Sequence, residues 1–244
     1  MTQSFQGGDG SSAGPASGAG MASGAAKVGD VTTPQLSIVI PVYNEEQILE
    51  EAVTALVGKV RGLGRSFELI LAANGCRDRT IPLALELSQK FPEVRLLECP
   101  TPNYGAALKL GMLQARGDVV LCDEIDLCDV DFYRRALDVL DRGEADLVVG
   151  SKAMAGADDR RPALRKAGTR VINGMLRVSL GFQGTDTHGL KAFRRTALLP
   201  VIHACVVDKD LFASEFVIRA QRSGVASMEI PVSLEEQRKP SIHL

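Results

Sequence analysis

The chain lacks several features that would assign a protein to a function class directly. Its 244 residues contain no run of about 18 uninterrupted apolar residues, which a membrane-spanning helix requires. The N-terminus shows no basic stretch followed by an apolar one, so we expect no secretory signal. Neither G-x-x-x-x-G-K-S/T nor G-x-G-x-x-G occurs, which argues against a P-loop ATPase and against a standard NAD site.

Few cysteines and little net charge exclude further classes. The five cysteines are odd in number and scattered, with no C-x-x-C pair, so we expect reduced thiols in the cytoplasm rather than disulfides or a zinc site. The histidines, His188, His203 and His243, show no metal-ligand spacing. A formal net charge of -2 argues against a nucleic-acid partner. The balance of 45% hydrophobic and 24% charged residues is typical of a soluble globular protein.

Residues 1–34 are dominated by glycine, alanine and serine and show no periodicity. Such a segment buries too little apolar surface to offset the entropy of ordering it, so we expect a disordered tail. The amino-acid composition changes at Leu36, and the length of residues 35–244 suits one ordinary domain.

Short aliphatic runs alternate with segments of helical period in the first part of this domain. The runs, each expected to be a strand, are 36–43, 67–73, 94–99, 118–124 and 146–151. The helices between them are expected at 49–60, 78–91, 103–115 and 130–142. Strands that are apolar on both faces and alternate with helices indicate an α/β fold with a mostly parallel sheet flanked by helices.

The pattern changes in the second part of the domain. A longer helix at 160–180 precedes an apolar run at 188–193, a helix at 210–223 and a last apolar run at 227–234. One face of the long helix is apolar and the opposite face basic, with Leu164, Val171 and Met175 against Lys166, Arg170 and Arg177. A helix lying on an anionic membrane surface has this pattern, and so does a core-packed helix with a solvated basic face.

Ligands of an open parallel sheet bind at the carboxyl ends of its strands. After the first strand, the ring of Tyr43 could stack on a base and the carboxylate of Glu45 could bind a ribose hydroxyl. The alternative is that this segment is only a turn before a helix. After the second strand, Asn74 is placed to bind a nucleobase edge, although turn chemistry explains it as well. The polar segment 184–189 suggests an acceptor pocket, in which His188 is either a pocket residue or a packed structural one.

The fourth strand leads into three carboxylates, Asp123, Glu124 and Asp126. Clustered like charges repel one another, so a bound cation accounts for them better than a solvated acidic loop, which is the alternative. Glu124 and Asp126 are two residues apart on a chain expected to be extended, so their side chains share a face. We expect both to approach one Mg²⁺ or Mn²⁺ whose other positions hold diphosphate oxygens and water.

Several motifs occur in the order found in one enzyme family. Ser37-Ile-Val-Ile-Pro-Val-Tyr-Asn-Glu-Glu46 is similar to that family's opening strand, and Asn103-Tyr-Gly-Ala-Ala-Leu108 to its third-helix motif. Gly117-Asp-Val-Val-Leu121 precedes the D-x-D position, and Asp186-Thr-His-Gly-Leu-Lys-Ala-Phe-Arg194 looks like the D-T-x-x-G-F-K-x-F-R segment. From Leu36 onward the chain resembles the inverting family 2 glycosyltransferases of GT-A fold, above all the dolichyl- and polyprenyl-phosphate sugar synthases.

The resemblance implies a donor site for a GDP- or UDP-sugar. Pro41, Tyr43 and Glu45 would hold the nucleoside, and Asn74 stands where the family usually has an aspartate that reads the base. Residues 35–152 would form this nucleotide-binding half, and residues 153–244 the acceptor half.

The resemblance also implies a metal and diphosphate site. Glu124 and Asp126 occupy the D-x-D positions and would ligate Mg²⁺ or Mn²⁺ together with the diphosphate. Lys152 matches a basic residue near the diphosphate, and Arg238 and Lys239 fall where a basic C-terminal segment closes over the phosphates. Positive charge there would stabilise the leaving diphosphate.

The acceptor decides whether a catalytic base is needed. A lipid phosphate is already an anion, whereas a hydroxyl acceptor requires a carboxylate base, for which Glu215, Asp208 and Asp186 are the candidates. Glu215 fits the acid of the family's F-D-x-E segment. A lipid acceptor would bring the protein into peripheral contact with the cytoplasmic face of a membrane.

Three departures from the family pattern keep other functions open. The usual D-D-G-S is Ala73-Asn-Gly-Cys76, the D-x-D is Glu124-Ile-Asp126, and F-D-x-E is Phe212-Ala-Ser-Glu215. A nucleotide-sugar-binding protein with weakened catalysis would show such changes. A nucleotidyltransferase would share the sheet and the metal, but it normally has a glycine-rich, basic loop where Pro41–Glu46 stands here.

Overall fold

The computed structural model of the chain describes residues 33–154, 163–209 and 211–232. The chain divides into Met1–Thr32 and Thr33–Leu244. The predicted tail, apart from its last two residues, and the predicted phosphate ligands Arg238 and Lys239 lie outside the described residues.

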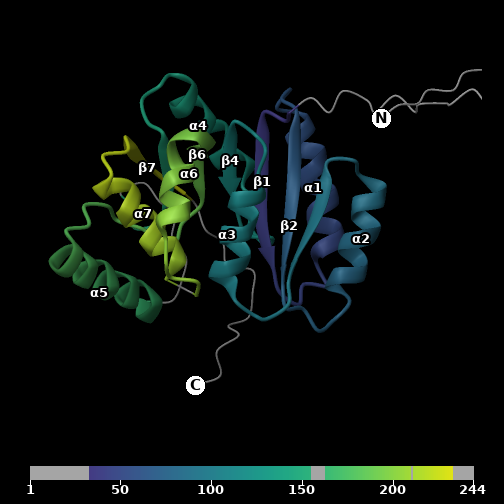
Figure 1. Cartoon of the computed structure of the whole chain (residues 1–244), viewed down its shortest axis with the longest axis horizontal. Coiled ribbons are helices and arrows are strands. Elements are labelled where there is room, and N and C mark those ends of the chain that lie inside the picture. Colours follow the sequence, from purple (N-terminus) through teal and green to yellow (C-terminus); the bar gives the residue numbers. More distant parts are fainter. Residues whose placement is uncertain (1–32, 155–162, 210, 233–244) are drawn as a thin grey trace, which may run out of the picture. The chain divides into compact units, whose positions relative to one another are not determined.

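A seven-stranded sheet runs through the described part of the chain (Figure 1). Its strands are β1 (Leu36–Val42), β2 (Phe67–Asn74), β3 (Val94–Cys99), β4 (Val119–Cys122), β5 (Leu147–Ser151), β6 (Lys191–Arg194) and β7 (Ser227–Pro231). The strands lie in the order β3-β2-β1-β4-β6-β5-β7, with β6 antiparallel to β4 and β5 and the other pairs parallel. The predicted α/β fold with a mostly parallel sheet is confirmed.

The strand order places a switch point between β1 and β4. The chain moves from β1 outward to β2 and β3, and then returns to the other side of β1 as β4. Loops that leave β1 and β4 at their carboxyl ends therefore diverge, which creates the crevice where open α/β sheets bind ligands. β4 ends opposite Val39, since Cys122 is the partner of Val39, whereas β1 continues to Val42.

Two groups of helices cover the two faces of the sheet. One core packs α1 (Leu49–Arg61), α2 (Thr80–Lys90) and α4 (Val130–Asp141) on one face. The other packs α3 (Tyr104–Gln114), α6 (Arg195–Ala204) and α7 (Phe212–Arg222) on the opposite face. β1 serves both cores because successive side chains alternate between its faces: Ile38 and Ile40 belong to the first core, and Val39 to the second.

Helix α6 was not predicted from the sequence. Pro200 stands inside it, and a proline in a helix interior removes a backbone hydrogen bond and usually ends the helix. The helix nevertheless buries Leu198, Val201 and Ile202, at the i, i+3 and i+4 positions of one face, in the second core. Tertiary packing therefore outweighs the local cost of the proline.

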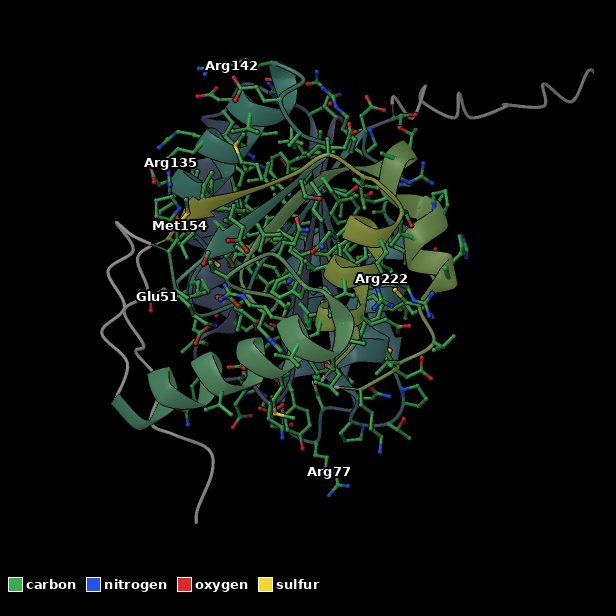
Figure 2. The ribbon with its side chains drawn as sticks, turned by 90° about the vertical axis from the view of Figure 1, so that its left-hand side faces the viewer. Glu51, Arg77, Arg135, Arg142, Met154 and Arg222 are labelled. Carbon is green, nitrogen blue, oxygen red and sulfur yellow. The ribbon has the colours of Figure 1, made fainter. Side chains whose placement is uncertain are left out.

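Helix α5 (Ala163–Leu180) lies within the predicted segment 160–180. Its described apolar side chains Val171, Met175 and Val178 are 63%, 66% and 92% exposed, so the core-packed alternative is wrong for this stripe. The side chains of Leu164, Lys166 and Arg170 lie outside the described residues. Figure 2 shows α5 on the side of the domain marked by Arg77, which follows β2, and away from Arg142 at the end of α4.

Candidate active site

A cavity of about 370 Å³, which we call the polar pocket, lies where the loops after β4 and β5 approach the segment before β6. The first residue of α3, the first turn of α7 and Val232, which follows β7, complete its wall. The lining residues are Tyr104, Glu124, Leu127, Lys152, His188, Gly189, Leu190, Ala213 and Val232. Two residues predicted for the diphosphate site, Glu124 and Lys152, therefore share one pocket.

Glu124 is held at the pocket wall by a tyrosine. The hydroxyl of Tyr104 donates to Glu124 Oε1 at 2.6 Å. Asn103 caps α3 by accepting the N–H of Ala106 at 3.1 Å, so the cap sets where Tyr104 leaves the helix. Burial, and after it the charge of Glu124, raises the pKa of Tyr104 well above its usual value, so the hydroxyl remains a donor. Sequence reasoning missed this role, although Tyr104 stands in the Asn103–Leu108 motif.

The acidic residues Asp123, Glu124 and Asp126 do not continue β4 as an extended strand. β4 ends at Cys122, and the N–H groups of Leu127 and Cys128 both donate to the carbonyl of Glu124, at 3.1 and 3.2 Å. Residues 125–127 therefore form a turn. The expectation of an extended chain from Glu124 to Asp126 is wrong, so the alternation of side chains along a strand no longer argues that the two share a face.

Asp123 belongs to the structure of this turn. It is 3% exposed, and its carboxylate accepts the N–H of Glu124 at 2.6 Å, the N–H of Asp129 at 2.9 Å and the hydroxyl of Tyr133 at 2.6 Å. Burial raises the pKa of Asp123 to about 7, while these hydrogen bonds act in the opposite direction. One of the three clustered carboxylates is thus explained without a cation.

Lys152 and Asp186 meet behind the pocket lining. Lys152 Nζ lies 3.7 Å from Asp186 Oδ2. Asp186 is 1% exposed and also accepts the backbone N–H of His188 at 2.9 Å. This carboxylate therefore orders the lysine and the loop, and it is not one of the residues that line the pocket. His188 does line it, with Nδ1 3.1 Å from the hydroxyl of Thr187.

A buried cation that sequence reasoning missed lies beneath the pocket. Lys191, in β6, is 2% exposed, and its Nζ donates to the carbonyl of Gly189 at 2.7 Å. Burial lowers the pKa of Lys191, and the charges of Asp186 and Glu124 are among those that oppose this fall. The sequence could have indicated this residue, because Lys191 lies in the Asp186–Arg194 motif.

The predicted nucleoside residues near β1 occupy different environments. Pro41 is buried within β1, opposite Ala72 of β2, and its missing N–H is tolerated because β4 has already ended at the level of Val39. Tyr43 is 44% exposed. The backbone N–H of Glu45 donates to the hydroxyl of Thr80 at 2.7 Å, which joins the loop after β1 to the start of α2.

Asn74 ends β2 and is 7% exposed. Its Oδ1 accepts the backbone N–H of Asn103, the cap of α3. This contact ties the end of β2 to the helix that presents Tyr104. The lining of the polar pocket includes neither Asn74 nor the predicted residues near β1.

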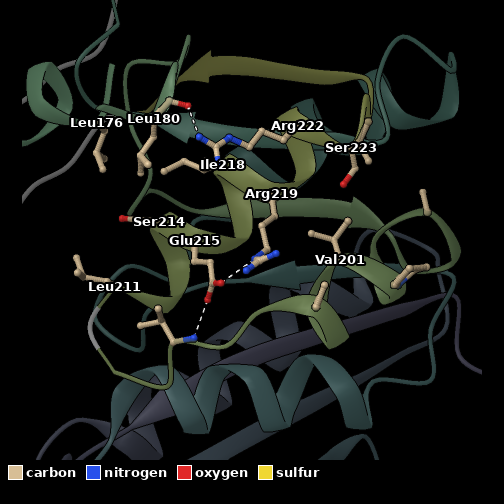
Figure 3. Close-up of a pocket in the computed structure, with 15 residues that line it drawn as sticks. Leu176, Leu180, Val201, Leu211, Ser214, Glu215, Ile218, Arg219, Arg222 and Ser223 are labelled. Atoms are coloured by element: carbon tan, nitrogen blue, oxygen red, sulfur yellow. Dashed lines mark hydrogen bonds and ion pairs between the residues drawn. The ribbon is translucent and has the colours of Figure 1, made fainter. Parts of the chain in front are cut away.

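Helix α7 separates two predicted features of the acceptor half. Ala213 lines the polar pocket, whereas Glu215 lines a second cavity (Figure 3). Glu215 Oε2 accepts the N–H groups of Val206 and Val207 at 2.9 and 2.7 Å, and Oε1 accepts from Arg219 Nε at 2.7 Å. Burial raises the pKa of Glu215, but these hydrogen bonds lower it further, so the net shift is downward. In this geometry Glu215 holds the α6–α7 loop and does not face the polar pocket.

The described residues contain no group of three or more His, Cys, Asp or Glu side chains that could hold a metal ion. Glu124 lines the polar pocket and Asp126 does not, but both are carboxylates, the ligand type that Mg²⁺ and Mn²⁺ take. Mg²⁺ is usually bound by one or two carboxylates together with substrate phosphates and water, rather than by a cage made only of protein groups.

The sheet order and the antiparallel β6 are those of a GT-A-like fold, and the polar pocket lies at the carboxyl end of β4, beside the switch point. The family model described as "Glycosyl transferase family 2" matches residues 37–201. The chain belongs to this family, which confirms the resemblance read from its motifs.

Curated relatives of the chain include proteins named for lipid-phosphate acceptors. Glycosyltransferase AglD of Haloferax volcanii is 30% identical over 216 residues, which are 86% of this chain and 34% of AglD. A dolichyl-phosphate beta-glucosyltransferase of Trichomonas vaginalis is 27% identical, over 85% of this chain and 68% of that protein. An undecaprenyl-phosphate 4-deoxy-4-formamido-L-arabinose transferase of Edwardsiella ictaluri is 28% identical, over 83% of this chain and 60% of that protein. The chain thus spans only part of each.

Solved structures of glucosyl-3-phosphoglycerate synthase from Mycobacterium tuberculosis share the fold. The complex with Mn²⁺, UDP-glucose and phosphoglyceric acid matches with a TM-score of 0.61 at 20% identity, over 85% of this chain and 73% of that one. The complex with UDP matches with a TM-score of 0.60 at 20% identity, over 85% and 74%.

Proposed function

We propose that this chain is a metal-dependent glycosyltransferase that moves a sugar from a GDP- or UDP-sugar to a polyprenyl phosphate. The observation that carries the proposal is the content of the polar pocket. Glu124 and Lys152 line it together, and Ala213 lines it where the resembled family has an acid. Glu124 and Lys152 therefore suit the binding of the departing diphosphate. The absence of an acid at Ala213 suits an acceptor that needs no deprotonation.

The comparisons support this choice of substrates. Two relatives are named for dolichyl phosphate and undecaprenyl phosphate, and a structural neighbour was solved with Mn²⁺ and UDP-glucose. In the proposal, Pro41, Tyr43, Glu45 and Asn74 bind the nucleoside within residues 35–152. The acceptor is bound by residues 153–244.

Catalysis in this proposal is mainly electrostatic. Glu124 and Asp126 would hold Mg²⁺ or Mn²⁺, which supplies positive charge against the charge that develops on the departing diphosphate. Tyr104 orients Glu124 through the 2.6 Å hydrogen bond, and Lys152 contributes a cation fixed by Asp186. The proposal also assigns Arg238 and Lys239 to the phosphates.

A phosphate acceptor is favoured over a hydroxyl because two of the three candidate bases, Asp186 and Glu215, are engaged elsewhere. The third, Asp208, is exposed and does not line the polar pocket. Asp186 is 1% exposed and paired with Lys152, and Glu215 lines the other cavity with both oxygens accepting hydrogen bonds. A phosphate oxygen is already ionised at neutral pH and attacks the sugar without a base.

Helix α5 is the proposed contact with the membrane that carries the acceptor. Val171, Met175 and Val178 form an exposed stripe with i, i+4, i+7 spacing, while Arg177 represents the basic face. Such a helix lies in the interface of an anionic bilayer. Among the described helices, none is long and apolar enough to cross a membrane. We propose peripheral attachment at the cytoplasmic face.

A nucleotide-sugar-binding protein with weakened catalysis is the second candidate function. Ala213 favours it, because no carboxylate stands at that position of the polar pocket. Asn74 favours it as well, because its side-chain oxygen is engaged by the N–H of Asn103.

The proposal is tested with Asp126→Asn in the full chain and transfer of labelled sugar to a polyprenyl phosphate in the presence of Mn²⁺. We expect transfer to fall by roughly 10–100-fold or more, the cost of weakening a metal site. Asp129→Asn is the matched control, because it also removes one charge but keeps a side chain able to cap α4 at the N–H of Phe132.

A thermal-shift panel of nucleotide-sugars with and without Mn²⁺ identifies the donor, since a bound ligand stabilises the folded state by mass action. Unchanged transfer by Asp126→Asn would refute the metal assignment. Donor binding without transfer to lipid phosphate or hydroxyl acceptors would favour the binding protein.

A further inference from the structure

A second cavity, which we call the apolar cavity, lies between α5, α6 and α7 (Figure 3). Its volume is about 620 Å³, within the roughly 300–1,000 Å³ of typical ligand pockets. Leu176 and Leu180 of α5, Val201 of α6 and Ile218 of α7 are among the apolar side chains that line it.

Hydrogen bonds fix the walls of the apolar cavity. Arg222 Nη2 donates to the carbonyl of Leu180 at 2.8 Å, and Gln221 Nε2 donates to the carbonyl of Gly181 at 3.1 Å. Gln221 Oε1 accepts the N–H of Gln183 at 3.1 Å. The end of α5 and the segment that follows it are thus joined to α7 by three hydrogen bonds, and the cavity is formed before any ligand enters.

The apolar cavity opens among exposed apolar side chains. Leu180 and Leu211 line it and are 37% and 58% exposed, so they stand at its mouth. Val206 on the α6–α7 loop and Met175 and Val178 on α5 are 74%, 66% and 92% exposed. An exposed apolar patch of this kind marks a surface that meets a membrane, a partner or a ligand.

The charges that line the apolar cavity favour an anionic amphiphile. Glu215 is offset by Arg219, whose Nε lies 2.7 Å from its Oε1. Arg222 remains as a cation at the wall, and its hydrogen bond runs to a neutral carbonyl. The apolar lining therefore complements a hydrocarbon chain, and the net positive charge of the wall complements a ligand that is negative overall.

The apolar cavity adjoins the polar pocket. Consecutive residues of the first turn of α7 serve the two, since Ala213 lines the polar pocket and Ser214 lines the apolar cavity. A helix is only about 10 Å across, so an elongated ligand in one cavity can present its head group at the other. We infer that the apolar cavity holds the hydrocarbon chain of the lipid-phosphate acceptor, an assignment that rests on the proposed function.

Filling the cavity tests this inference. Ala204 lines it, is exposed and ends α6, so Ala204→Trp fills the site without disturbing the core. The chain contains no tryptophan, so the new side chain also reports ligand binding by its fluorescence. Leu85→Trp is the matched control, because Leu85 is 47% exposed on α2, on the other face of the sheet. Leu180→Asp, a second variant, places a carboxylate at the mouth.

The probe is farnesyl phosphate, titrated by calorimetry into the full chain without nucleotide, beside farnesol, inorganic phosphate and dodecyl phosphate. We expect the wild type to bind farnesyl phosphate more tightly than the other three probes. Ala204→Trp and Leu180→Asp should each weaken that binding by at least about tenfold, the smallest effect of a methylene-sized change in an apolar pocket. Leu85→Trp should bind as the wild type does, and only the tryptophan at position 204 should change its emission.

Wild-type affinity in both Ala204→Trp and Leu180→Asp would overturn the inference, as would equal loss in Leu85→Trp. Equal binding of dodecyl phosphate would overturn the assignment to the acceptor and point to membrane acyl chains. Thermal shifts with UDP and Mn²⁺ are measured on the same variants and should match the wild type. If no nucleotide binds any of them, the proposed function fails, while the farnesyl phosphate titrations still decide whether the cavity binds an apolar chain.

Discussion

Replacing Tyr104 by phenylalanine tests whether the hydroxyl at the pocket wall orients Glu124. The chain offers a matched control in Tyr133→Phe, because the hydroxyl of Tyr133 donates to the neighbouring Asp123, also at 2.6 Å. Each change removes one O–H and keeps the ring. The two variants therefore make the same chemical change at two carboxylates, the one that lines the polar pocket and the one that builds the turn.

The expected stability losses follow from burial. Hydrogen bonds to charged groups contribute roughly 1.5–3 kcal/mol. Tyr133 is fully buried and Asp123 is 3% exposed, so Tyr133→Phe should cost about 2–3 kcal/mol. At roughly 2–4 °C per kcal/mol for a domain of this size, Tm falls by about 4–12 °C. Glu124 is only partly buried, so water can replace the hydroxyl of Tyr104, and Tyr104→Phe should cost less than about 1 kcal/mol.

The expected effects on ligand affinity are the reverse of those on stability: Tyr104→Phe should weaken binding more than Tyr133→Phe. Removing a group that orients a metal ligand typically costs 10–100-fold in metal affinity, so UDP binding in the presence of Mn²⁺ should weaken about tenfold in Tyr104→Phe. Tyr133→Phe should bind as the wild type does at temperatures well below its Tm. Circular-dichroism melting and calorimetric titration measure the two quantities. Wild-type affinity in Tyr104→Phe, or a tenfold loss in Tyr133→Phe, would refute this division of roles.

Other predictions concern the fold and the membrane contact. Glu68→Gln should cost roughly 2–3 kcal/mol in urea unfolding, because the 4% exposed carboxylate of Glu68 pairs with two partly exposed arginines; a loss below 1 kcal/mol would contradict this. Gly105→Ala should lower Tm, since a Cβ there would overlap the carbonyl of Lys209, and an unchanged Tm would show that the loop yields freely. The folded-state pKa of Glu215 lies below the unfolded one, so its stabilising contribution is present at neutral pH and lost as pH falls through the folded pKa. Melting curves of the wild type and Glu215→Gln should therefore differ at pH 7 and converge as the pH falls below the folded-state pKa of Glu215. Val178→Asp should reduce binding to anionic vesicles without changing Tm, because that side chain is 92% exposed, and unchanged binding would remove α5 as the contact.

Much of the fold could be predicted because it depends on local periodicity. The five strands of the first part and the helices between them follow from runs of apolar residues and their spacing. Helix α6 was not predicted because Pro200 disfavours a helix locally, and only the burial of Leu198 and Ile202 compensates for it. The turn after Glu124 was not predicted because it depends on hydrogen bonds to Asp123 from residues as distant as Tyr133.

The sequence by itself determined which polar residues follow the strands, and therefore that Glu124 and Lys152 come near one edge of the sheet. Only the tertiary structure decided which side chains share a pocket. Ala213 and Glu215 are two residues apart on α7, and successive residues of a helix turn by about 100°, so the two side chains point in nearly opposite directions. Which of them meets the polar pocket depends on how α7 rotates against its neighbours, and that is set by packing between segments far apart in the chain.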